Sequence, residues 1–264
     1  MREHINGTVL AWDESGAGEP ALLVHGIGET RSAWRHQLED FGARFRVIAC
    51  DVRGFGESET GDGAGSVEQL AADLRALLDR LGAGPARVIG FSMGGVIAQR
   101  FALDHPDMTR AVVIAASSSV VNRRAADYYL ERAALAERDG VAALRAAAMG
   151  DAAVCFTVSG ADIIEAYREV RRNGVRDAAG FANAARAMAS LLEAPLTEAL
   201  AGLRAPALVI TGERDIFCPP KASEIIHARI RGSLLRIVPA VGHCLHWEDP
   251  ATFNRTVLDF LASA

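Results

Sequence analysis

Several features that mark specialised protein classes are absent from this sequence. Its four cysteines are widely spaced and form no C-x-x-C pair, so we expect free thiols rather than a zinc site or a redox-active dithiol. The longest stretches without a charged residue are about a dozen residues long, whereas a membrane-spanning helix needs roughly 20. The sequence therefore predicts a protein without a transmembrane helix and without a membrane partner.

Clustered positive charge is also lacking. The formal net charge is -5, and lysine occurs only at Lys221. A nucleic-acid-binding surface must supply cations that replace phosphate counterions, so no nucleic-acid partner is expected. The segment Met1–Gly7 contains an acidic residue and polar residues where a secretory signal has an apolar run, and we therefore expect a cytoplasmic protein.

The remaining composition is that of an ordinary globular protein, with 50% hydrophobic and 23% charged residues. Over the first 120 residues, short runs rich in valine, isoleucine and leucine alternate with segments of helical periodicity. This alternation is typical of βαβ units around a buried parallel sheet and predicts an α/β fold. The predicted strands are Thr8–Trp12, Ala21–His25, Arg46–Asp51, Arg87–Phe91, Ala111–Ala116, Ala207–Thr211 and Leu234–Pro239. The predicted helices are Ser32–Phe41, Val67–Leu81, Met93–His105 and Pro250–Leu261.

Residues 121–203 interrupt this alternation. They are rich in alanine, helical in pattern and without a strand-like run of comparable strength. We interpret them as a helical cap inserted after the sixth strand, in a chain whose core domain comprises residues 1–120 and 204–264. Most of the large side chains of the cap are expected to pack it onto the core, and a minority to line a pocket. These side chains are Tyr128, Tyr129, Met149, Phe156, Tyr167, Phe181 and Met188.

The pattern G-x-S-x-G occupies residues 90–94, between a predicted strand and a predicted helix. In that context the serine lies on a sharp turn, and both glycines must lack side chains because the backbone passes close to them. We therefore predict that Ser92 is a nucleophile; the alternative is a glycine-rich turn with a helix-capping serine. Phosphate binding is disfavoured, because the segment has neither the P-loop lysine nor the G-x-G-x-x-G pattern.

A serine hydroxyl becomes an effective nucleophile only when a base accepts its proton and a carboxylate orients that base. We predict that His243 is the base, because it follows the last predicted strand and so lies at the carboxyl edge of the sheet, where Ser92 emerges. Asp215 follows the preceding strand and is the predicted acid. The three residues would form one hydrogen-bonded chain.

Other residues compete for these roles. His246 stands beside Trp247, just before the last predicted helix, and is expected to pack rather than to react. Glu213 falls within a turn and Asp177 within the cap, so both are weaker candidates for the acid.

A second glycine-containing loop, H-G-I-G at residues 25–28, ends an early strand. The backbone N–H groups of Ile27 and Met93 are predicted to form an oxyanion hole for a tetrahedral intermediate. His25 is expected to brace this loop rather than to act as a second base. The nearby turn at residues 51–58 is interpreted as structural.

Together these motifs resemble those of the α/β-hydrolase superfamily, and the resemblance covers essentially the whole chain. The motifs are H-G-I-G at 25–28, D-V-R-G-F-G-E-S at 51–58, G-F-S-M-G-G at 90–95, T-G-E-R-D at 211–215 and G-H-C-L-H-W-E-D-P at 242–250. The resemblance implies an α/β-hydrolase fold, with a mostly parallel central sheet flanked by helices, and the chain order Ser, Asp, His of its catalytic triad.

Within the superfamily the chain resembles a group that includes 3-oxoadipate enol-lactonases, small carboxylesterases, cofactor-free perhydrolases and meta-cleavage carbon–carbon hydrolases. Phe91 stands where meta-cleavage hydrolases usually have asparagine, and Ile27 where perhydrolases tend to have an aromatic residue followed by proline. Both departures disfavour those two activities. Ser92 argues against haloalkane dehalogenases and epoxide hydrolases, whose nucleophile is an aspartate.

The predicted protein is thus a serine hydrolase that cleaves a small carboxylic ester or lactone through an acyl-enzyme intermediate. It needs no metal or organic cofactor and acts as a monomer or homodimer. Trp34, Phe91 and Phe217, with Cys218, are predicted walls of the substrate pocket because they adjoin the motif loops. Two alternatives remain open: a carbon–carbon bond hydrolase of the meta-cleavage type, and a non-catalytic ligand receptor on the same fold.

Overall fold

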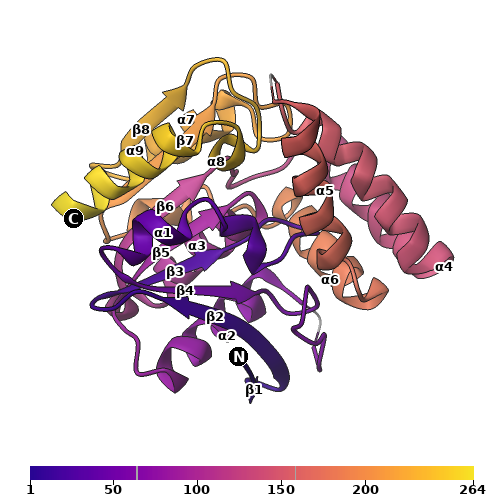
Figure 1. Cartoon of the computed structure of the whole chain (residues 1–264), viewed down its shortest axis with the longest axis horizontal. Coiled ribbons are helices and arrows are strands. Elements are labelled where there is room, and N and C mark those ends of the chain that lie inside the picture. Colours follow the sequence, from indigo (N-terminus) through magenta and orange to yellow (C-terminus); the bar gives the residue numbers. More distant parts are fainter. Residues whose placement is uncertain (64, 158) are drawn as a thin grey trace.

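The computed structural model of the chain describes residues 1–63, 65–157 and 159–264. Within these residues eight strands form one sheet, in the order β1-β2-β4-β3-β5-β6-β7-β8 (Figure 1). The pairs β1–β2 and β2–β4 are antiparallel, and the other neighbouring strands are parallel. The strands are β1 (Arg2–Ile5), β2 (Thr8–Ser15), β3 (Pro20–Val24), β4 (Arg46–Asp51), β5 (Ala86–Phe91), β6 (Thr109–Ala115), β7 (Ala207–Gly212) and β8 (Leu234–Val238).

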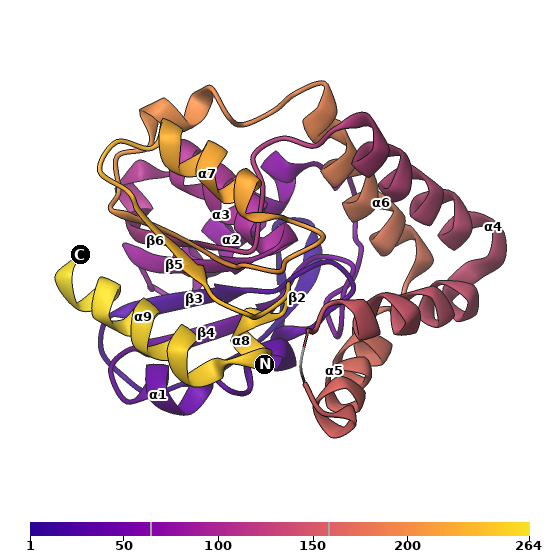
Figure 2. The same cartoon turned by 90° about the horizontal axis from the view of Figure 1, so that it is seen from above.

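Helices cover both faces of this sheet (Figure 2). One face carries α2 (Val67–Arg80), α3 (Met93–Asp104) and α7 (Pro220–Arg229), and the other carries α1 (Leu38–Gly42) and α9 (Pro250–Ser263). The alternation of side chains along a strand explains the two layers: in β3, Leu22 and Val24 join the apolar cluster on the first face, whereas Ala21 and Leu23 join the cluster on the second. Both faces are therefore apolar and buried.

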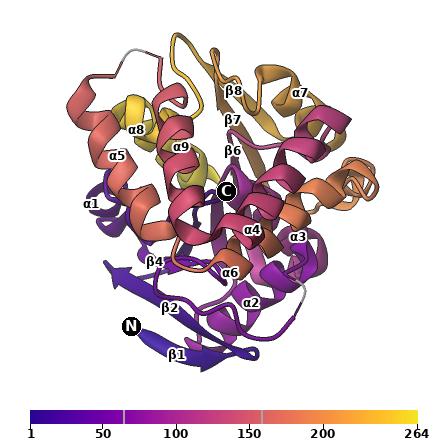
Figure 3. The ribbon, with the colours of Figure 1, turned by 90° about the vertical axis from the view of Figure 1, so that its right-hand side faces the viewer.

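In the described residues between β6 and β7 there are three α-helices, namely α4 (Arg123–Val154), α5 (Ala161–Gly174) and α6 (Ala178–Ala189). Figure 3 shows them together on one side of the molecule, in front of the sheet. The path of α4 is broken at Gly140, whose φ of 75° and ψ of -171° are not helical. We refer to α4, α5 and α6 as the cap, and to the sheet and its flanking helices as the core.

The predicted α/β fold, with a mostly parallel sheet, helices on both faces and a helical insertion after the sixth strand, is confirmed. Strand β1 was not predicted, because four residues carry too short a pattern to register as a strand. The predicted helix Ser32–Phe41 is wrong as one element: it divides into a 3₁₀ turn at Arg31–Trp34 and the helix α1. Between the two, Gln37 is fully buried and donates to the His246 carbonyl, a tertiary contact that overrides the helical periodicity.

The prediction of free thiols is confirmed, since all four cysteines are buried and none forms a disulfide. In the described part of the chain, no helix is both long enough and apolar enough to cross a bilayer.

Candidate active site

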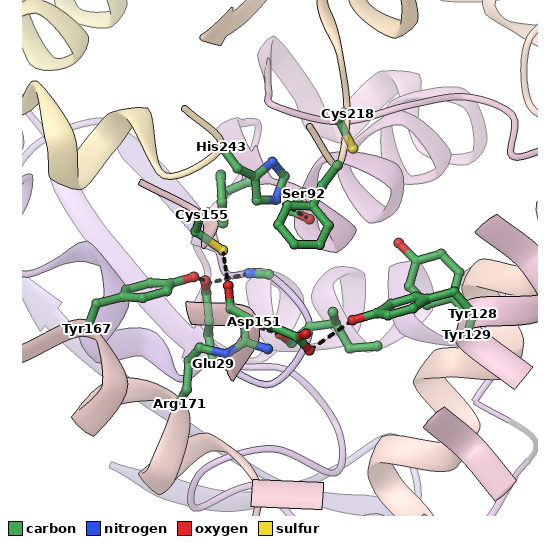
Figure 4. A pocket seen from close by; sticks show the side chains of 14 residues that line it. Glu29, Ser92, Tyr128, Tyr129, Asp151, Cys155, Tyr167, Arg171, Cys218 and His243 are labelled. Carbon is green, nitrogen blue, oxygen red and sulfur yellow. Dashed lines mark hydrogen bonds between the residues drawn. The ribbon is translucent and has the colours of Figure 1, made fainter. Parts of the chain in front are cut away.

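Ser92 lies on the turn that joins β5 to α3, and it has φ 52° and ψ -116°. This conformation is costly for a residue with a side chain. A Cβ atom at Gly90 would overlap the carbonyl oxygen of Gly94, and one at Gly94 would overlap that of Val24, so the turn fits only with glycine at both positions. The turn is further fixed by the Ser117 hydroxyl, which donates to the Ser92 carbonyl at 2.7 Å. The backbone thereby holds the Ser92 hydroxyl at the wall of a pocket (Figure 4).

His243 lies within hydrogen-bond reach of Ser92. It follows β8, and its Nε2 atom is 3.2 Å from Ser92 Oγ. On the other side of the ring, Nδ1 donates to Asp215 Oδ2 at 2.8 Å. Because an ionised carboxylate only accepts hydrogen bonds, this contact assigns the proton to Nδ1 and leaves Nε2 free to accept the Ser92 proton. The structure thus brings Ser92, His243 and Asp215 together in one row of hydrogen bonds, as predicted from the sequence.

Asp215 is fixed by its own turn after β7. The backbone N–H groups of Phe217 and Cys218 each donate to Oδ1 at 2.9 Å, and the residue is 3% exposed. The competing acids are occupied elsewhere: Glu213 accepts from the N–H of Ala240, and Asp177 caps the first turn of α6. Neither contacts His243.

The two histidines of the last loop differ in electrostatic surroundings. Burial opposes the charged form of His243, but the Asp215 carboxylate and its hydrogen bond outweigh this and raise the pKa of His243 above 6.5. Burial and the nearby His243 lower the pKa of His246 well below 6.5. Within the described residues neither ring nitrogen of His246 has a hydrogen-bond partner, and its ring centroid lies 4.3 Å from that of Phe91. His246 packs in the core, as predicted.

The predicted oxyanion loop is a four-residue turn. The N–H of Glu29 donates to the carbonyl of Gly26 at 3.3 Å, and Gly28 at the third position has φ 77°. His25 donates from Nδ1 to the Gly26 carbonyl at 2.8 Å and accepts at Nε2 from the N–H of Val52 at 2.9 Å. Both ring nitrogens are engaged and burial lowers the pKa of His25, which confirms it as a neutral brace. Ile27 lies at the pocket wall, and Met93 begins α3.

The turn at residues 51–58 is structural, as interpreted from the sequence. Arg53 and Asp73 form an ion pair at 2.6 Å in which both side chains are 3% exposed. The Ser58 hydroxyl donates to the carbonyl of Asp51 at 2.7 Å. These residues hold the loop and do not line the pocket.

A cavity of about 460 Å³, part of it open to solvent, lies between core and cap. The core lines it with Gly26, Ile27, Glu29, Phe91, Ser92, Phe217, Cys218 and His243, and the cap side with Tyr128, Tyr129, Asp151, Cys155, Tyr167 and Arg171.

Of the predicted pocket walls, Phe91 and Phe217 line the cavity, and so does Cys218. The prediction for Trp34 is wrong. Trp34 is fully buried and packs against His246 and Phe253, with ring centroids 5.2 and 6.3 Å apart. The 3₁₀ turn after the oxyanion loop directs the indole into the core below α9, and proximity in sequence did not reveal that direction.

Four polar residues of the pocket carry no sequence motif. Glu29 accepts hydrogen bonds from the N–H of Gly26 at 2.8 Å and from the Tyr167 hydroxyl. Asp151 accepts from Tyr128 and Arg132, each at 2.9 Å. Only the four-residue spacing of Tyr167 and Arg171, which places both on one face of a helix, offered a signal.

The arrangement suits nucleophilic chemistry. Among residues 1–63, 65–157 and 159–264, no group of three or more His, Cys, Asp or Glu side chains is placed so that it could hold a metal ion. The groups that the structure brings together are the Ser92 hydroxyl, the His243 imidazole and the Asp215 carboxylate.

Comparison with known proteins decides the family, because residues 20–250 match the model of the alpha/beta hydrolase fold. The chain belongs to the α/β-hydrolase family. 3-oxoadipate enol-lactonase 2 of Acinetobacter baylyi is 30% identical over 243 residues, which span 91% of this chain and 88% of that protein. Along nearly its whole length the chain thus resembles hydrolases of this family.

Solved structures of the α/β-hydrolase family agree with this assignment. A malate-bound thermophilic esterase from Thermogutta terrifontis superposes with a TM-score of 0.90 at 28% identity, covering 100% of this chain and 98% of that one. The enol-lactonase from Burkholderia xenovorans superposes with a TM-score of 0.88 at 27% identity, covering 99% and 100%.

Proposed function

We propose that the protein is a serine hydrolase that cleaves a small carboxylic ester or lactone. The observation that carries this proposal is the hydrogen-bonded chain from Asp215 through His243 to Ser92, which ends at the wall of a cavity beneath the cap. Similarity to enol-lactonases and esterases supports the bond type. The cavity of about 460 Å³ has the volume of a site for one small molecule.

The reaction proceeds in two halves. Ser92 Oγ attacks the carbonyl carbon while its proton passes to His243 Nε2, and the tetrahedral adduct then collapses as His243 gives that proton to the departing alkoxide. Water, deprotonated by His243, attacks the resulting acyl-enzyme and releases the carboxylic acid and free Ser92. Asp215 stays ionised, orients the imidazole and stabilises the imidazolium.

The negative charge of the tetrahedral adduct needs donors. We assign them to the backbone N–H groups of Ile27 and Met93, the second of which lies at the N-terminus of α3, where the helix leaves such groups without an intrahelical partner. Loss of one such donor typically costs about 2.7 to 4 kcal/mol of barrier. Phe91 and Phe217 flank His243, with ring centroids at 4.9 and 5.2 Å.

The test is hydrolysis of short-chain nitrophenyl esters and of an aliphatic lactone by the wild type and by Ser92→Ala. We expect the variant to lose at least about 10⁴-fold in kcat. The matched control is Ser263→Ala, an exposed serine in α9, which should retain wild-type activity. Comparable turnover by Ser92→Ala and the wild type would overturn the assignment of the nucleophile.

The two alternatives give opposite results in the same assay. A carbon–carbon hydrolase would bleach a dienoate substrate and barely cleave the esters. A receptor would bind its ligand tightly, leave it intact and show no turnover that depends on Ser92.

A further inference from the structure

The oxyanion loop is held at three successive peptide groups. The peptide that carries the Gly26 N–H donates to Glu29 Oε2 at 2.8 Å. The next peptide consists of the Gly26 carbonyl and the Ile27 N–H. His25 Nδ1 donates to this Gly26 carbonyl at 2.8 Å. The third peptide has its Ile27 carbonyl bound by Arg171 Nη1 at 3.2 Å. Because the two ends of a trans peptide point in opposite directions, fixing the Gly26 carbonyl also fixes the direction of the Ile27 N–H.

Two of these three contacts depend on the cap. Arg171 belongs to α5 and donates directly to the loop, and its Nε atom is anchored to the Ala148 carbonyl of α4 at 3.2 Å. Tyr167, one turn earlier in α5, donates its hydroxyl to Glu29 Oε1 and so orients the carboxylate that holds Gly26. Burial raises the pKa of Tyr167 well above its ordinary value, so the hydroxyl remains the donor.

The backbone of α5 also meets the loop closely. A Cβ atom at Gly174 would overlap the carbonyl oxygens of Gly28 and Glu29, so only glycine allows this approach. Residues 167, 171 and 174 are spaced by four and three positions and share one helix face. Tyr167, Arg171 and Glu29 are 0%, 8% and 1% exposed, so these contacts are buried.

We propose that helix α5 of the cap orients the oxyanion loop, with Arg171 bound to the Ile27 carbonyl and Tyr167 acting through Glu29. Both are positioning residues: they hold the peptides on either side of the one that presents the Ile27 N–H, and so fix the direction of the donor that stabilises the transition state. The proposal rests on the proposed ester or lactone hydrolysis. It gives the cap a part in the chemical step beyond the choice of substrate.

The kinetic test uses Tyr167→Phe, Arg171→Met and Arg171→Lys, with nitrophenyl butyrate as substrate and an alkyl trifluoromethyl ketone as an analogue of the tetrahedral adduct. For Tyr167→Phe and Arg171→Met we expect kcat to fall about 10- to 100-fold, with KM changed less than about twofold. The inhibition constant of the ketone should rise by the same factor as kcat/KM falls. Arg171→Lys should recover part of the loss, because an ammonium group still donates to a carbonyl.

The matched control is Arg172→Met on the same helix. Arg172 is exposed and pairs with Glu165 at 3.2 Å, away from the loop, and its replacement should leave kcat, KM and the inhibition constant unchanged. A loss confined to KM, or a kcat of Tyr167→Phe and Arg171→Met within about twofold of the wild type, would show that α5 merely shapes the pocket and would overturn the proposal.

Amide hydrogen exchange separates this proposal from the proposed function, because it requires no turnover. In Tyr167→Phe the Gly26 and Glu29 amides should exchange at least about tenfold faster, and in Arg172→Met at the wild-type rate. Faster exchange in Tyr167→Phe, together with a wild type that cleaves no ester, would refute the activity and support the coupling of α5 to the loop. Unchanged exchange in a protein that does cleave esters would refute the coupling alone.

Discussion

The two walls of the cavity are built differently. On the core side, the residues of the predicted triad and the predicted oxyanion loop lie on turns that follow strands: Ile27 after β3, Ser92 after β5, Asp215 after β7 and His243 after β8. On the cap side, the polar groups lie on helices. Their partners belong to the other half of the same helix, as for Tyr128 and Asp151 of α4, to another helix, or to the opposite wall. The core wall is fixed by strand register and short turns, whereas the cap wall is fixed by side-chain contacts over long distances in sequence.

This difference separates the geometry of the reacting groups from the shape of the pocket. Parallel strands bring their carboxyl ends to one edge whatever the details of the loops, so reacting groups placed there keep their mutual geometry. The cap wall has no such frame, and replacing a few side chains changes the shape of the pocket. We therefore expect the core to determine the reaction and the cap mainly to determine the substrate, with the α5 contacts joining the two regions.

The largest expected effect tests the core wall at Asp215. In Asp215→Asn the amide no longer fixes the Nδ1 proton of His243, so we expect kcat to fall about 10⁴-fold with KM little changed. Steady-state kinetics on a nitrophenyl ester measures both constants.

Its control is Glu213→Gln, an acid on the same turn whose carboxylate accepts from Ala240 and not from His243. This variant should keep kcat within about twofold of the wild type. A similar loss in both variants would mean that the turn, rather than the carboxylate of Asp215, supplies the effect.

A smaller effect is expected on the free energy of unfolding, which we compare for one variant in the core and one in the cap. Asp73→Asn in the core leaves Arg53 buried without a charged partner, and should lower the free energy of unfolding by about 3 to 5 kcal/mol. Glu137→Gln in the cap breaks the ion pair with Arg186, in which the side chains are 49% and 46% exposed, and should cost less than about 1 kcal/mol. Urea unfolding of both variants provides the comparison, and equal costs would contradict it.

The smallest effect concerns pH. His243 must be neutral to accept the Ser92 proton, and its pKa is raised by the Asp215 carboxylate against the opposing effect of burial. The acidic limb of kcat/KM should therefore lie above pH 6.5, with activity falling about tenfold per pH unit below it. A limb at or below that value in the wild type would show that burial outweighs the effect of the Asp215 carboxylate on the His243 pKa.

Much of the core wall could be predicted from the sequence. The turn at Ser92 can be identified from its two flanking glycines, which a tight turn requires, and from the apolar strand before them. The positions of Asp215 and His243 followed because successive parallel strands end at the same edge. Their roles in catalysis remain predictions until the variants are measured.

The cap wall could not be predicted in the same way. Helical periodicity identifies a buried face but not the element that covers it. The contact of Arg171 with the Ile27 carbonyl could therefore not be predicted from the sequence. The error at Trp34 has the same origin: the position of a residue next to a motif does not give the direction of its side chain. Both need the long-range packing that a single sequence does not record.

The backbone at Ser92 has a consequence for how such a chain evolves. Its φ of 52° and ψ of -116° suit glycine, and holding a serine there costs on the order of 1–3 kcal/mol. Selection for a stable fold alone favours glycine at this position, whereas selection for turnover favours serine. The residue found at position 92 along a lineage therefore records which of these two pressures has been the stronger.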